Sequence, residues 1–116
     1  MSEEEEQPIT TTTTHRLSGH HLAYLVTAGN SVLHSELVPA RHLLQFHNDS
    51  IYVPQGTIYV EASIILYGVG GIHIAMFRTT LHPQVLATTL NTLTWRILAD
   101  YLEYVIGATP HPSPST

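Results

Sequence analysis

The sequence of 116 residues contains no cysteine, which excludes a disulfide scaffold and any metal site built on thiolates. It also contains no lysine, and its only basic residues are Arg16, Arg41, Arg78 and Arg96. Four cations neutralise few phosphates. The chain therefore lacks the basic surface by which nucleic acids and acidic membranes are bound.

Charge of either sign is scarce outside the N-terminus. The formal net charge is −5, and residues 3–6 are four consecutive glutamates that contribute −4 of it. The rest of the chain is nearly neutral, so its surface contains a large uncharged area. We expect some of this area to contact another protein.

Long apolar runs are also missing. The uncharged stretch 62–77 is interrupted by Gly68, Gly70, Gly71 and His73 and falls short of the ~20 residues of a membrane-spanning helix. The N-terminus is acidic rather than basic and apolar, so no secretory signal is predicted. We expect a soluble, intracellular protein.

The two ends of the chain differ from its middle. Residues 1–16 combine the glutamates with a run of threonines, and residues 108–116 are rich in proline and serine. Neither segment has the apolar content that offsets the entropy of ordering, so both are predicted to be disordered tails. Residues 17–107 are predicted to form a single domain, near the small end of what supports its own core.

Within this domain the apolar residues first recur with period two, which is typical of strands. Gly29 and Asn30 predict the turn of a first hairpin, and residues 47–50 predict a second turn. The glycine-rich residues 68–71 predict a third reversal, after the strongest strand of the chain. We expect strands at residues 22–26, 31–37, 43–46, 51–53, 57–67 and 72–78.

After Thr80 the period changes to that of a helix, which Pro83 opens and Gly107 ends. The helix is predicted over residues 83–106, with one apolar stripe at Leu86, Leu90, Leu93, Ile97 and Tyr101. A second stripe consists of Trp95, Leu98, Leu102 and Val105. The second stripe is either part of a broad core contact or a face for a partner protein. The fold class is mainly β with a C-terminal α-helix, as a small barrel or β-sandwich plus helix.

No pattern of catalytic or metal-binding residues emerges. The nine histidines do not form a His-Glu-x-x-His motif, and there is no Gly-x-Ser-x-Gly motif. The glycines of residues 68–71 precede a strand pattern, whereas a phosphate-binding loop precedes a helix. We expect no enzymatic activity, no metal and no cofactor.

Tyr52, Tyr59 and Tyr67 recur along the predicted strands. Aromatic side chains in this arrangement are compatible with a platform on which bases of single-stranded nucleic acid stack. Ordinary cross-strand packing explains them as well, because few arginines are available to meet phosphates.

The order of elements resembles the small OB-fold subunits of single-strand-binding complexes, such as the smallest subunit of replication protein A and the small subunit of the telomere-capping complex. The glycine-opened strand at residues 56–60 and the helix entry at residues 81–86, followed by Leu90 and Leu93, carry the resemblance. It implies an OB-like barrel and a non-enzymatic small subunit in single-stranded DNA or telomere maintenance. It also implies a nuclear location and weak or indirect contact with nucleic acid. The subunit would bind a larger protein through its C-terminal helix, at Trp95, Leu98, Leu102 and Val105.

A different binding role stays open beside this one. A compact β-plus-helix module of this size also suits an adaptor or a viral or fungal accessory protein. Such a module would bind a host protein and would not contact nucleic acid.

Overall fold

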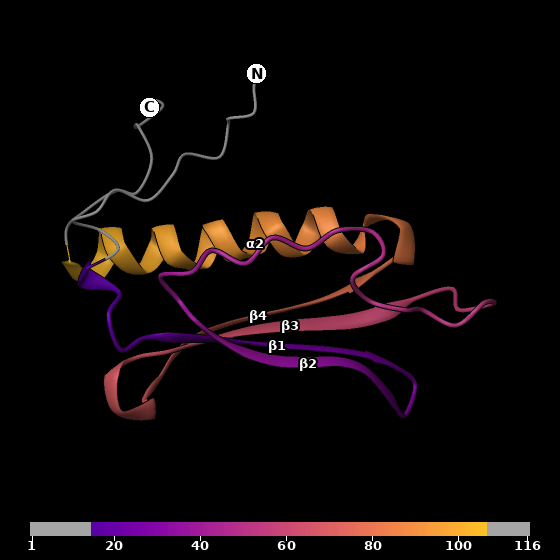
Figure 1. Ribbon diagram of the computed structural model, residues 1–116, viewed down its shortest axis with the longest axis horizontal. Coiled ribbons are helices and arrows are strands. Elements are labelled where there is room, and N and C mark those ends of the chain that lie inside the picture. The colour runs from indigo at the N-terminus through magenta and orange to yellow at the C-terminus, as the bar shows by residue number, and fades with distance from the viewer. Residues whose placement is uncertain (1–14, 107–116) are drawn as a thin grey trace, which may run out of the picture.

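The computed structural model describes residues 15–106, which form one antiparallel sheet and one long helix (Figure 1). The four strands are β1 (His21–Ala28), β2 (Ser31–Pro39), β3 (Val60–Tyr67) and β4 (His73–Leu81), and their order in the sheet is β2-β1-β3-β4. The predicted class, mainly β with a C-terminal helix, is confirmed. In the described residues the sheet does not close into a barrel, because β2 and β4 remain as two free edges.

Two tight reversals set the strand order. Gly29 adopts a φ of 60° between β1 and β2, where the sequence predicts a turn. Between β3 and β4 the chain forms a short 3-10 helix, η1 (Val69–Gly71), in which Gly70 and Gly71 have φ values of 84° and 82°. Residues with a Cβ atom rarely adopt these positive φ values. The predicted first hairpin and the predicted glycine reversal are thus both present.

The prediction of strands at 43–46 and 51–53 is wrong, because residues 40–59 form no strand. The turn between them is present, since the Ser50 N–H donates to the His47 carbonyl at 2.9 Å. The backbone of Phe46 pairs with a side chain instead of a strand. Its N–H donates to Asn91 Oδ1 at 3.0 Å, and its carbonyl accepts from Asn91 Nδ2 at 3.2 Å. The strand predicted from residue 57 begins only at Val60.

One face of the sheet forms the core. Alternate residues of β1 and β3 are buried there: Leu22, Tyr24, Val26, Val60, Ala62, Ile64 and Leu66. The helix α2 (Leu86–Tyr101) packs over β3 and β4 on this face. Figure 1 shows the helix as a second layer on one side of the sheet, with residues 40–59 running beside it.

Residues 40–59 complete the cover of the same face. Phe46 is buried and packs edge-on against Tyr24 of β1, with ring centroids 4.8 Å apart. The same ring lies 5.7 Å from that of His34, on β2. Together α2 and this segment enclose the core over all four strands.

The helix begins where Pro83 predicts. The His82 ring accepts a hydrogen bond from the Gln84 N–H at 3.2 Å, and a 3-10 turn η2 (Pro83–Val85) leads into α2. A π-helical turn η3 (Leu102–Ile106) continues it. The end predicted at Gly107 and both predicted tails, apart from His15 and Arg16, lie outside the described residues.

A hydrogen bond joins the two ends of the described chain. Nε2 of His20, just before β1, lies 2.9 Å from the hydroxyl of Tyr101 at the end of α2. Nδ1 of the same ring lies 3.4 Å from the Ser18 carbonyl oxygen. A carbonyl only accepts, so a neutral ring donates from Nδ1 and accepts from Tyr101 at Nε2.

Candidate functional site

The face of the sheet opposite the helix has no layer over it in the described part of the chain (Figure 1). Strand pairing places its side chains in rows that cross the sheet. One row takes an apolar residue from each strand, in the order Leu37, Ala23, Ile65, Met76. We call these four residues the apolar row, and the whole surface the open face.

The two ends of the apolar row are exposed to solvent, and Ala23 and Ile65 between them are half-buried. Leu37 is 62% exposed and Met76 is 43% exposed, and Leu25 of the next row is 39% exposed. Val32, near the end of β2 on the same face, is 62% exposed. A contiguous exposed apolar surface of this kind is typical of a binding surface rather than of scattered surface residues.

Polar residues surround the apolar row. On one side lie His21, Tyr67 and His73, with the Tyr67 and His73 rings 6.1 Å apart. On the other side the face carries one cation, Arg78, and one anion, Glu61. An apolar centre within a polar rim is the usual anatomy of a protein–protein interface.

No protein-family model, curated protein sequence or solved structure matches this chain. None of the helices in residues 15–106 is both long enough and apolar enough to cross a membrane.

The outer face of the helix contrasts with the open face. The exposed residues of α2 are polar or charged: Thr88, Thr92, Arg96 and Asp100. In η3, which follows it, Glu103 and Tyr104 are exposed. An amphipathic helix with one apolar side turned to the core has this pattern. The uncovered apolar surface therefore lies on the sheet and not on α2.

The four residues predicted to bind a partner do not form an exposed stripe. Leu98 and Leu102 are fully buried in the core, and Trp95 is half-buried. The side chain of Val105 lies outside the described residues. Leu98 and Leu102 thus belong to the broad core contact that the sequence left open, since both lie in the same buried apolar cluster as the sheet residues. In this fold those two side chains are inaccessible to a partner.

The three tyrosines considered for base stacking are not brought together. Tyr59 and Tyr67 lie at the two ends of β3, roughly 25 Å apart at about 3.3 Å per residue. Tyr52 lies in the segment between β2 and β3, at a pocket beside the helix. Stacked bases need neighbouring aromatic rings, so the three residues do not make one platform.

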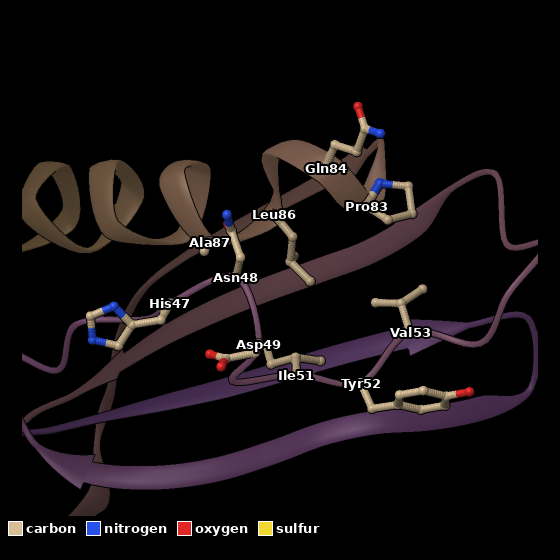
Figure 2. Close-up of a pocket in the computed structure, with 10 residues that line it drawn as sticks. All are labelled: His47, Asn48, Asp49, Ile51, Tyr52, Val53, Pro83, Gln84, Leu86 and Ala87. Atoms are coloured by element: carbon tan, nitrogen blue, oxygen red, sulfur yellow. The ribbon is translucent and has the colours of Figure 1, made fainter.

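That pocket lies between residues 47–53 and the start of α2, with a volume of about 640 Å³ (Figure 2). Ile51, Val53 and Leu86 supply apolar surface. The polar groups come from His47, Asn48, Asp49, Tyr52 and Gln84, and they do not point toward one common place in Figure 2. Small-molecule sites have polar groups that converge on the ligand. The pocket has the size of a ligand site without this convergence.

Metal ligands are not gathered in the described region. No three histidine, aspartate or glutamate side chains within residues 15–106 lie close enough together to hold an ion. The contact of this kind within those residues is a hydrogen bond between His34 Nε2 and Glu36 Oε1 of β2, at 2.9 Å.

Sequence reasoning identified both faces of the strands but not which one stays open. Ile65 and Met76 pair with each other on the open face of β3 and β4. The apolar character of these outward positions was the available signal. Polar residues are usual at such positions when an antiparallel sheet faces water.

Proposed function

We propose that this chain is a non-enzymatic subunit of a protein assembly and that it assembles through the open face of its sheet. The apolar row of Leu37, Ala23, Ile65 and Met76, which is exposed at both ends, carries the proposal. Burying such a row gains roughly 25 cal/mol for each Å² of apolar surface removed from water. A chain with a body of some ninety residues also gains stability from a partner, because a small core buries little surface.

The chemistry of the open face favours protein over nucleic acid. Arg78 is its one arginine, and Glu61 lies close to it on the neighbouring strand. Binding to a phosphate backbone depends on several cations. In a single-strand-binding or telomere complex, the setting that the family resemblance suggests, this chain would contribute protein contacts rather than base contacts.

The test is the native assembly of the full-length chain. A tagged chain is isolated from its own cells and the mass and composition of its complex are measured, with Leu37→Lys as the test variant. Thr92→Lys, on the polar outer face of α2, is the matched control. We expect the wild type and the control to enter the same assembly and Leu37→Lys to be released from it. An assembly that retains Leu37→Lys would contradict the proposal.

A further inference from the structure

We propose that the partner on the open face is a second copy of this chain, in a symmetric dimer with the two sheets face to face. The inference rests on the proposed function, since it names the protein that occupies the same surface. A two-fold dimer needs a surface that is complementary to itself. The apolar row, Leu25 and the two charged residues provide that complementarity.

The two charged residues of the open face, Glu61 and Arg78, favour a second copy as the partner. Glu61 and Arg78 are both exposed, and within the described residues neither has an ion-pair partner. The open face therefore presents one isolated charge of each sign. A strongly acidic or basic partner would place a like charge against one of them. A second copy offers an opposite charge to both.

Strand register fixes how the two copies must be turned. Arg78 pairs with Ser63, two residues along β3 from Glu61, so the two charges are one strand and two residues apart. With about 4.8 Å between strands and about 3.4 Å per residue, the offset is roughly 35° from the strand direction. Consider a two-fold axis that lies between the two sheets and parallel to them. If it crosses the line from Glu61 to Arg78 at its midpoint and at a right angle, it places each of these residues over the position of the other. Each Glu61 then lies opposite Arg78 of the other copy.

The same axis passes through apolar surface. Extended over β1 and β2, it runs between Leu25 and Leu37, which are two of the exposed leucines of the face. Each leucine therefore packs near its own counterpart in the second copy. The operation also brings Ile65 against the Val32 end of β2. One arrangement thus covers the exposed apolar residues and forms two ion pairs.

This arrangement agrees with known sheet packing. The strands of the two copies cross at roughly 70° for the spacings above, which is nearer the orthogonal class than the aligned class. The dimer has four layers, with a helix outside each sheet. The exposed side chains of Leu25, Val32 and Leu37 are then shielded from water.

The first experiment measures the mass of the purified full chain by sedimentation or light scattering. We expect about twice the 12.8 kDa of one chain. Leu37→Glu is expected to raise the dimer dissociation constant at least ~100-fold, because it places an unpaired charge at the axis. Circular dichroism should show the variant folded, and Thr92→Glu is the matched control that stays dimeric. A wild-type chain that is monomeric at every concentration would overturn the inference.

The second experiment isolates the ion pairs. Glu61→Arg and Arg78→Glu should each weaken self-association at least about tenfold, because each creates two like-charge contacts across the axis. Mixed together, the two variants should form a heterodimer near wild-type affinity, since both contacts are again opposite in sign. Charges that interact only within one chain would give no recovery on mixing. Absence of recovery would therefore overturn the assigned register.

The third experiment uses the absence of cysteine. Leu37→Cys gives the chain a single thiol close to the axis, and a short thiol–thiol cross-linker should join two copies rapidly. Thr92→Cys, on the far side of the molecule, should react with the linker without joining copies. Equal cross-linking of the two variants would overturn the face-to-face arrangement.

Failure of the dimer is distinguishable from failure of the proposed function. If the purified chain is monomeric but its native assembly still requires Leu37, the open face binds a different protein. The second copy is then excluded as occupant while the proposed function stands. If the assembly does not require Leu37, both fail.

Discussion

The hydroxyl groups of Tyr24 and Thr94 lie 2.9 Å apart inside the core, although the two residues are separated by 70 positions in the chain. The Thr94 hydroxyl also donates to the Leu90 carbonyl at 2.8 Å. A hydroxyl has one hydrogen, so Tyr24 must be the donor in the first bond. The two bonds form a directed chain from β1 to the backbone of α2. Removing either hydroxyl therefore has a different consequence.

Thr94→Val should destabilise the fold more than Tyr24→Phe. The valine leaves the buried Tyr24 hydroxyl without an acceptor, which costs about 1–3 kcal/mol. In Tyr24→Phe the Thr94 hydroxyl remains bonded to the Leu90 carbonyl, so we expect the free energy of unfolding to fall by only about 1 kcal/mol. Urea unfolding monitored by circular dichroism measures both. The double variant should be no less stable than Thr94→Val, and equal effects of the two single changes would contradict the assigned donor.

Stability should fall at alkaline pH because of Tyr24. Burial is the largest cause that raises the pKa of its hydroxyl from 10.0 to about 12, and the negative charge of Glu36 adds to the rise. Above pH 10 the unfolded chain loses this proton while the folded chain keeps it, so the free energy of unfolding falls as pH rises towards 12. Below pH 10 the contribution is complete. The difference between the two pKa values corresponds to a loss of roughly 2–3 kcal/mol in the free energy of unfolding.

The measurement is the unfolding free energy in denaturant at increasing pH. Tyr24→Phe should remove this part of the alkaline decline, whereas Tyr52→Phe, at an exposed position, should preserve it. The chain has no lysine or cysteine, so its six tyrosines are the side chains that ordinarily ionise near pH 10. An unchanged decline in Tyr24→Phe would show that another group causes it.

Asn91 should hold residues 40–59 on the core. Its amide forms both backbone hydrogen bonds of Phe46, and Asn91→Ala removes them together. We expect a loss of about 1–3 kcal/mol and faster hydrogen exchange in residues 43–53. Thr92→Ala, the exposed neighbour, is the control and should change neither quantity. Unchanged exchange in Asn91→Ala would mean that the packing of Phe46 alone holds the segment.

Local patterns were sufficient to predict the two hairpins. Gly29 and residues 68–71 mark reversals by backbone chemistry alone, and the alternation in β1 and β3 is clear in the sequence. The same alternation in residues 43–53 was misleading. The backbone of Phe46 in this segment bonds to Asn91, which lies far along the chain in a helix. No residue near Phe46 in the sequence therefore indicates that its backbone bonds to a side chain and not to a strand.

The uncovered face was harder to predict, because it depends on tertiary packing. Helical periodicity shows that Leu98 and Leu102 share a stripe, but not whether that stripe meets the sheet, a loop or water. In the structure both lie in the same buried apolar cluster as the sheet residues. Likewise β3 has apolar residues on both faces, and only the position of α2 determines that Ile65 belongs to the uncovered one.

The helix residues of the second stripe differ in burial, so their substitutions should differ in effect. Leu102→Glu should unfold the domain, because the carboxylate would be buried without a partner. Leu98→Ala should cost about 2–5 kcal/mol, the usual range for a fully buried leucine. Trp95 is half-buried, so Trp95→Ala should leave the domain folded and cost less than Leu98→Ala.

Thermal unfolding by circular dichroism ranks these variants. Arg96→Ala is the control, because it lies exposed on the same helix and should change stability by less than about 0.5 kcal/mol. The predicted order of destabilisation is Leu102→Glu, then Leu98→Ala, then Trp95→Ala. A Leu102→Glu chain that keeps its fold would require the end of α2 to separate easily from the sheet. The second stripe would then be accessible after all, and the helix would return as a surface for a partner.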